Sequence, residues 1–257
     1  FFMFPIFWVV SLSLKSIPEI FVHPPLWFSK NPHTENYRFV LEHTHILRQM
    51  ANSVKIVFFT VAITLAVAIP AAYAFSRFRF RFKRPLLLLI LIFQMVSPVI
   101  IAIPLYRFFV QTGLINQHWS LILVYSAIEL PFATWFLRGY LDTITPELDE
   151  AAKIDGCNRW QTVRKVLIPV CMPGIVSVMI LVAGHSWSQF VIPFILLDDK
   201  ALFPVSVGLL NLQSSSEAIT VHYLAASSVI SIVPVILVFV ILQRFIVGAL
   251  TSGAVKG

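Results

Sequence analysis

The chain has 257 residues, of which 58% are hydrophobic and only 12% are charged, and its formal net charge is +7. A soluble globular domain carries about a quarter charged residues, so the composition favours a membrane protein over a soluble one. Its two cysteines, Cys157 and Cys171, exclude a disulfide framework, and no Cys/His cluster has metal-ligand spacing.

Apolar runs recur along the whole chain, and a helix needs roughly 20 apolar residues to cross a bilayer. The first run, Phe1–Leu14, is short and opens without Met, so we interpret it as the remainder of a first spanning helix. The runs do not alternate as the strands of a membrane barrel do. We therefore predict an all-α membrane protein, one domain over residues 1–257, with six spans at about 1–14, 54–75, 85–109, 120–136, 174–195 and 224–242.

The first connecting segment, Lys15–Ser53, is rich in Pro, His and aromatic residues. Within it, Asn31–His45 has the spacing of a short amphipathic helix lying on the membrane, with an apolar face of Tyr37, Val40 and Leu41. A second long segment is Leu196–Tyr223. Such segments are either docking surfaces for a partner or simple connectors, and both readings stay open.

Basic residues set the predicted orientation, because Lys and Arg prefer the cytoplasmic side. The stretch RFRFRFKR, Arg77–Arg84, holds five basic residues and no acid, and the loop 138–168 and the tail are also basic. Both chain ends are then cytoplasmic. We interpret the stretch as a topological anchor rather than a lipid or nucleotide site, and the net charge as this membrane bias rather than a nucleic-acid surface.

The cytoplasmic loop 138–168 reads as two short helices. Thr145 suits an N-cap and Pro146 the first helical position, while Gly156 suits the C-terminal cap. Acidic residues favour the positive end of the helix dipole, and three stand in the first turns: Glu147, Asp149 and Glu150.

The second helix of this hairpin begins with Asn158 and Gln161 in a capping-box arrangement. Small apolar faces are expected at Leu148, Ala151 and Ala152 and at Trp160, Val163 and Leu167. Either these faces pack on the protein's own helix ends, as we expect for Trp160, or Leu148–Ile154 fills a groove on a cytosolic partner. In the second case Glu150 or Asp149 pairs with a partner arginine.

Polar residues inside the spans are the other candidates, because charges in a bilayer usually face the bundle interior or a water-filled cavity. Interhelical hydrogen bonding is the alternative explanation for each. The candidates for a solute path are Gln94, Glu129, His185 and Gln189. No phosphate-binding loop of the GxxxxGK[ST] type is present, and no catalytic constellation stands out, so we expect no ATP hydrolysis by this chain.

The sequence EAAKIDG, followed by nine residues and then VLIP, resembles the EAA motif of membrane subunits of binding-protein-dependent ABC importers. Val166 and Ile168 stand where that motif usually has Ile and Leu. The flanks LRGYLDTITPELDEAAKIDG, WSQFVIPFILL and QRFIVGALTSGAVKG are similar to the sugar-importer branch, and the last resembles the maltose-type second permease subunit. WSQF departs from the usual Trp-Asn-x-Phe at Ser188.

The resemblance implies a type I importer permease for a carbohydrate, with glycerol-phosphate or an acidic oligosaccharide as the alternative solute. A self-sufficient secondary transporter is disfavoured, since it needs no ATPase dock. The implied partners in the bacterial inner membrane are a second permease subunit, two ATP-binding subunits that hold ATP and Mg²⁺, an external solute-binding protein and membrane lipid.

The same resemblance assigns roles to two segments of this chain. It implies an ATPase-coupling helix made of Glu147, Leu148, Asp149, Glu150, Ala151, Ala152, Ile154, Asp155 and Gly156. It also implies a tail that contacts the ATPase through Gly253, Ala254, Val255, Lys256 and Gly257.

Overall fold

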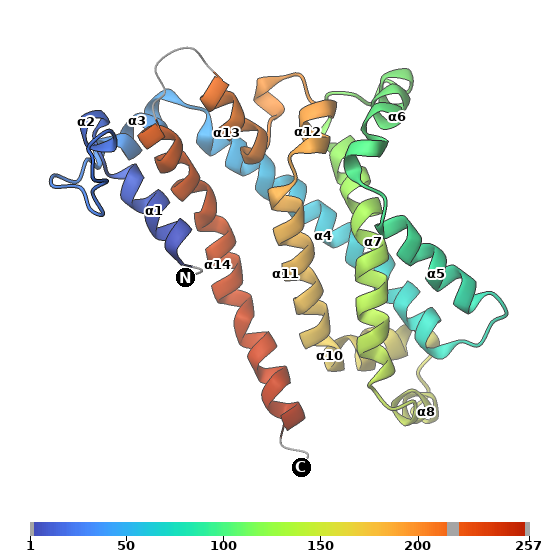
Figure 1. Cartoon of the computed structure of the whole chain (residues 1–257). Coiled ribbons are helices and arrows are strands. Elements are labelled where there is room, and N and C mark those ends of the chain that lie inside the picture. The colour runs from blue at the N-terminus through green and yellow to red at the C-terminus, as the bar shows by residue number, and fades with distance from the viewer. Residues whose placement is uncertain (1–2, 215–220, 255–257) are drawn as a thin grey trace.

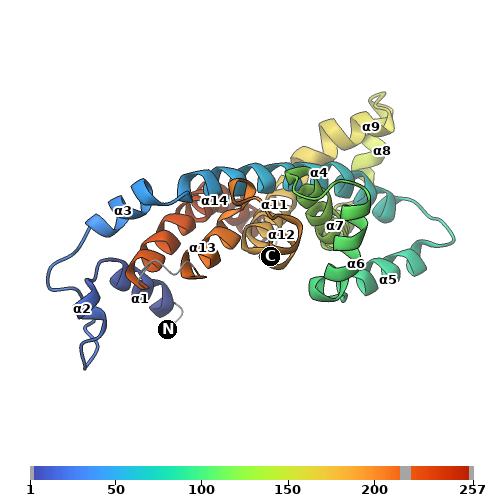
Figure 2. The same ribbon diagram turned by 90° about the horizontal axis from the view of Figure 1, so that it is seen from above.

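The computed structural model describes residues 3–214 and 221–254, with the side chains of 211, 213–214 and 244–254 left out of the description. The described parts are helical (Figures 1 and 2). The N-terminal half contains α1 (Phe4–Ser13), α2 (Ile17–Ile20), α3 (Glu35–His43), α4 (Ile46–Arg77), α5 (Lys83–Gln94), α6 (Pro98–Gln111) and α7 (His118–Asp142). The C-terminal half contains α8 (Glu147–Ile154), α9 (Arg159–Gln161), the π-helical η1 (Thr162–Leu167), α10 (Ile168–Val170), α11 (Met172–Ser188), α12 (Val191–Leu196), the 3₁₀ helix η2 (Lys200–Leu202), α13 (Val205–Ser214) and α14 (Val221–Ala254).

Within the described residues, three helices are long and apolar enough to cross a membrane on their own: α4, α7 and the Val221–Gln243 part of α14. Two bent pairs, α5 with α6 and the hairpin helix 159–170 with α11, raise this number to five if each counts as one span. The shorter helix α1 is apolar and lies beside α14 (Figure 1).

The predicted span 85–109 is not one continuous helix. α5 ends at Gln94, α6 begins at Pro98, and the two axes differ by 91°. Proline lacks the N–H that would continue the helix and disfavours helical backbone at the residue before it. Ser97 is accordingly extended, and its hydroxyl accepts a hydrogen bond from the Val99 N–H at 3.4 Å, which caps α6. The predicted span 174–195 likewise ends as a helix at Ser188, before the extended Gln189.

The long helices α4 and α7 pack against each other through small side chains. Four residues spaced by one helical turn on α4 are fully buried: Thr60, Thr64, Ala68 and Ala72. Small residues let two helix backbones approach closely where lipid offers no hydrophobic driving force. This stripe therefore fixes α4 beside α7 along the centre of the molecule.

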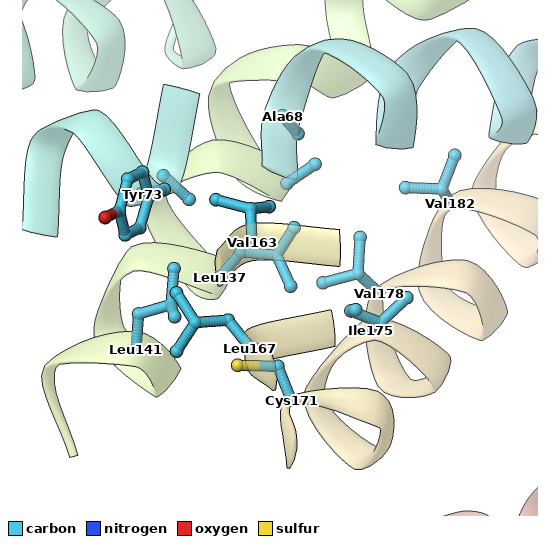
Figure 3. Packing of buried hydrophobic residues seen from close by; sticks show 12 residues of the cluster. Ala68, Tyr73, Leu137, Leu141, Val163, Leu167, Cys171, Ile175, Val178 and Val182 are labelled. Atoms are coloured by element: carbon cyan, nitrogen blue, oxygen red, sulfur yellow. The ribbon is translucent and has the colours of Figure 1, made fainter. Parts of the chain in front are cut away.

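A buried apolar cluster joins the hairpin to three spans (Figure 3). α4 and α7 contribute Tyr73, Leu137 and Leu141, and η1 contributes Val163 and Leu167. Cys171 comes from the turn between α10 and α11, and α11 contributes Ile175, Val178 and Val182. The hairpin is thus part of the protein core rather than a loose connector.

The segment before α4 packs on the protein. The amphipathic helix expected within Asn31–His45 is present as α3, and its apolar face is divided: Val40 is buried in the protein, whereas Leu41 is 44% exposed. Val40 is fully buried against Ile46, Val205 and Ala226, because α3 contacts α14 and α4. Of the second long segment, 196–223, residues 215–220 lie outside the described residues.

Candidate functional site

Helix α8 is capped at its C-terminal end as the sequence predicts, but its N-terminal end differs from the prediction. The helix begins at Glu147, so Pro146 is the N-cap and Thr145 makes no side-chain cap. At the other end, Gly156 has φ 81°, its N–H donates to the Lys153 carbonyl at 3.0 Å, and the Cys157 N–H donates to the Ala152 carbonyl at 2.9 Å. This pair of bonds is a Schellman motif, which needs the left-handed backbone that glycine adopts without strain.

The second helix of the hairpin has the predicted capping box. The Gln161 N–H donates to Asn158 Oδ1 at 2.9 Å, and the Asn158 N–H donates to Gln161 Oε1 at 2.8 Å. Val163 and Leu167 are buried, but the prediction that Trp160 packs on the protein's own helix ends is wrong, since Trp160 is 63% exposed. The π-helical turn of η1 takes more residues than an α-helical turn, so it breaks the spacing that grouped Trp160 with the buried pair.

A buried ion pair fastens α8 to the end of α4. Arg77 Nε donates to Asp149 Oδ2 at 2.7 Å, and the two side chains are only 12% and 8% exposed. Arg77 Nη2 also donates to the Ile144 carbonyl at 3.0 Å, just before α8. Asp149 therefore pairs within this chain and not with a partner arginine, and Arg77 has a structural role beyond that of a topological anchor.

The outward face of α8 is the part of the hairpin open to a partner. Ile154 is 87% exposed, and Glu147, Glu150, Ala151, Asp155 and Gly156 are exposed with it. Leu148 is half-buried, while Ala152 is buried like Asp149. The apolar face expected from Leu148, Ala151 and Ala152 is consequently divided, with Ala152 facing the protein and Ala151 facing out beside Ile154.

Three of the four predicted solute-path residues line one cavity of about 960 Å³ between α4, α5, α6, α7 and α11: Gln94, Glu129 and His185. Glu129 is buried and its Oε1 is hydrogen-bonded to His185 Nδ1, which links α7 to α11. Gln189, the fourth, is not part of the lining but contacts His185, with 3.3 Å between Nε2 atoms. The Glu129–His185 contact is an interhelical hydrogen bond on the cavity wall, and the role of these residues in a solute path stays a prediction.

The predicted tail contact lies at the end of α14. Gly253 and Ala254 close this helix, and Val255, Lys256 and Gly257 lie outside the described residues. The C-terminal end of α14 is at the same end of the molecule as α8 and α10 (Figure 1).

These features define a helical membrane transport subunit, with a rigid hairpin at one end of the molecule and a polar-lined cavity between its spans. Residues 45–252 match the family described as "Binding-protein-dependent transport system inner membrane component", and the chain belongs to this family. It is a permease subunit of an ABC importer, as the EAA motif predicts, and a multi-pass protein of the bacterial inner membrane.

Known proteins of the same kind resemble the chain over nearly its full length. It is 33% identical to the probable ABC transporter permease protein YurM of Bacillus subtilis, over 99% of this chain and 84% of the relative. It is 30% identical to the trehalose/maltose transport system permease protein MalG of Thermococcus litoralis, over 99% of this chain and 92% of the relative. The crystal structure of a bacterial ABC transporter that imports the acidic polysaccharide alginate has the same fold, with a TM-score of 0.81 and 23% identity over 94% of this chain and 90% of that one.

Proposed function

We propose that this chain pairs with a second, homologous permease subunit to import an oligosaccharide that an external solute-binding protein delivers. Two separate ATP-binding subunits hold ATP and Mg²⁺ and hydrolyse the nucleotide, and this chain binds no cofactor of its own. The hairpin and both chain ends face the cytoplasm, while membrane lipid surrounds the spans. The carbohydrate assignment is supported by the trehalose/maltose permease among the relatives.

The outward face of α8 carries this proposal. A helix of eight residues is marginal in water, yet here its geometry is set in advance by the Gly156 cap and by the Arg77–Asp149 pair. Ile154, which is 87% exposed on this helix, is an apolar side chain that a partner surface can bury. A short helix with one apolar anchor and flanking acids fits a groove on an ATP-binding subunit, in the helix-in-groove mode of recognition.

Coupling then follows from how α8 is attached. Closure of the ATP-binding subunits displaces α8, and the Arg77–Asp149 pair carries the displacement to α4. The buried cluster beneath the hairpin carries it to α7 and α11. Because α4, α7 and α11 all border the cavity that holds Glu129 and His185, their movement changes which side of the membrane the cavity opens to.

The test removes the apolar anchor without touching the interior. Ile154→Asp places a charge where a groove expects an apolar side chain, so the ATP-binding subunits should no longer co-purify with the permease pair, and solute-stimulated ATP hydrolysis should be lost. Membrane insertion stays intact because Ile154 makes no buried contact. The control is Ile17→Asp at a half-exposed position of α2, far from α8 (Figure 1), which should leave co-purification unchanged. If the Ile154→Asp permease still co-purifies with the ATP-binding subunits and its complex still shows solute-stimulated ATP hydrolysis, the docking role is refuted.

A further inference from the structure

The wall of the cavity between α4, α5, α6, α7 and α11 has a distinctive charge pattern. Among the described residues that line it, Glu129 and His185 are the titratable ones, and none is Lys or Arg. Because these two are hydrogen-bonded to each other, the pair is either neutral overall or carries a single negative charge. The cavity thus offers no net positive charge to a solute.

This pattern opposes anionic solutes. When the pair carries its single negative charge, an anionic group about 6 Å from Glu129 is disfavoured roughly 100-fold in binding at an effective dielectric constant of about 20. A carboxylate, a sulfonate or a dianionic phosphate also presents only hydrogen-bond acceptors, and the Glu129 carboxylate is itself an acceptor. An anionic group and the Glu129 carboxylate therefore cannot form a hydrogen bond with each other.

Hydroxyl groups fit the same wall. A hydroxyl both donates and accepts, so a polyhydroxylated solute can donate to Glu129 and accept from the amide of Gln94. In the part of the chain that the structure describes, Gln94 makes no side-chain hydrogen bond, which leaves its amide available at the cavity surface. The cavity lining also contains aromatic rings, on which the apolar faces of sugar rings can pack, as in other small-molecule sites. These are Phe75, Phe93 and Phe132, on three different helices.

Resting on the proposed function, we infer that this cavity is a subsite for an uncharged oligosaccharide, with Glu129 as the acceptor that His185 orients and Gln94 as a second polar contact. His185 Nδ1 holds one Glu129 oxygen, and Gln189 approaches the other ring nitrogen of His185 at the end of α11. The subsite selects against uronic acids and sugar phosphates. Fold likeness to the alginate transporter does not conflict with this, since the charge of the cavity wall and not the fold sets the preference.

The experiment uses the purified complex of both permease and both ATP-binding subunits in lipid nanodiscs, without the binding protein, so that selection by the binding protein does not enter. The probes are neutral di- and trisaccharides, each paired with its uronic-acid analogue and with an amino-sugar analogue, and binding is measured as thermal stabilisation of the complex. We expect the neutral member of a pair to bind at least tenfold more tightly than the uronic acid. Equal or tighter binding of the uronic acid, or an amino sugar that binds no better than the uronic acid, overturns the inference.

Two cavity variants test whether Glu129 and Gln94 cause the preference for neutral sugars over uronic acids. Glu129→Gln should weaken binding of the neutral sugar at least tenfold and reduce the discrimination against the uronic acid. Gln94→Ala, on an exposed side chain that does not support the fold, should weaken neutral-sugar binding without changing that discrimination, so the test survives if Glu129→Gln fails to assemble. The matched control is Glu42→Gln on the exposed face of α3. Unchanged neutral-sugar binding in both cavity variants overturns the subsite.

The two proposals fail in different ways. If the chain is not an oligosaccharide permease, no saccharide stabilises the complex and none stimulates its ATP hydrolysis when the binding protein is present. If only the subsite is wrong, saccharides still bind and stimulate hydrolysis, but their charge preference or their response to Glu129→Gln differs from that stated above.

Discussion

Arg77→Met tests whether the ion pair to Asp149 holds the hairpin in place. The substitution keeps most of the side-chain volume but removes the guanidinium, which leaves the Asp149 carboxylate 8% exposed and without its cation. Breaking a buried ion pair in this way costs about 3–5 kcal/mol, because the remaining charge is buried without compensation. Local undocking of α8 releases that charge to water more cheaply than unfolding of the spans does, so the cost should appear as hairpin opening.

The chain contains a natural probe for this opening. Cys171 is 4% exposed in the cluster beneath the hairpin, where Leu167 of η1 lies close to it (Figure 3). In a Cys157→Ser background, Cys171 should react with a membrane-permeant maleimide on the order of 100-fold faster when Arg77 is replaced, since each 1.4 kcal/mol is about tenfold in an opening equilibrium.

The control for this labelling experiment is Arg38→Met. Arg38 forms an exposed pair with Glu42, with side chains 78% and 51% exposed, and such surface pairs contribute little to stability. The Cys171 labelling rate should therefore stay within a factor of about three of the wild type. If Cys171 is labelled as slowly in Arg77→Met as in the protein with Arg77 intact, the apolar cluster alone holds the hairpin, and the role assigned to the ion pair is wrong.

Two glycines offer matched pairs of variants. Gly156→Ala forces a side chain into the left-handed backbone at φ 81° and should destabilise the hairpin by about 1–2 kcal/mol, which faster Cys171 labelling would show. Its control is Gly139→Ala, where an added Cβ meets nothing within 4 Å, and the Cys171 labelling rate should stay unchanged. Gly174→Ala brings a Cβ to 2.7 Å from the Tyr140 ring, and this overpacking of α7 against α11 should lower the melting temperature of the complex by at least about 3 °C. Its control is Gly184→Ala on the same helix, where an added Cβ meets open space and the melting temperature should stay unchanged. Equal effects within either pair would contradict the packing argument.

Features that depend on local sequence could be predicted well. The Gly156 cap and the Asn158–Gln161 capping box need only a few neighbouring residues, and both are present as expected. Hydropathy located the long helices, because crossing a bilayer requires length and apolar composition. It could not show the 91° break before Pro98, since a sum over apolar residues does not contain the angle at which two helices meet.

Contacts between distant parts of the chain could not be predicted in the same way. The sequence shows Glu129 and His185 only as two polar residues within spans, whereas their direct bond joins positions 56 residues apart. Arg77 and Asp149 are 72 residues apart, and a basic run beside a span reads as an anchor unless the position of α8 is known. The sequence offers only a weak signal: Arg77 is the first cation after the apolar run 54–75, and Asp149 is one of three acids in the first turns of α8.

Helix α4 connects the two ends of the molecule more directly than any pattern in the sequence suggests. At the hairpin end it holds Asp149 through Arg77. At the opposite end, Asn52 Nδ2 donates to the carbonyls of Ala201 and Phe203 at 3.0 and 3.1 Å, and Ser53 Oγ accepts from the Val205 N–H at 2.9 Å. A single helix of 32 residues spans about 48 Å, and its small-residue stripe ties it to α7 between these two points. A displacement of α8 must therefore either move α4, and with it the loop before α13, or break the Arg77–Asp149 pair. Breaking a buried pair costs about 3–5 kcal/mol, so α4 moves with α8 whenever its own displacement costs less than that.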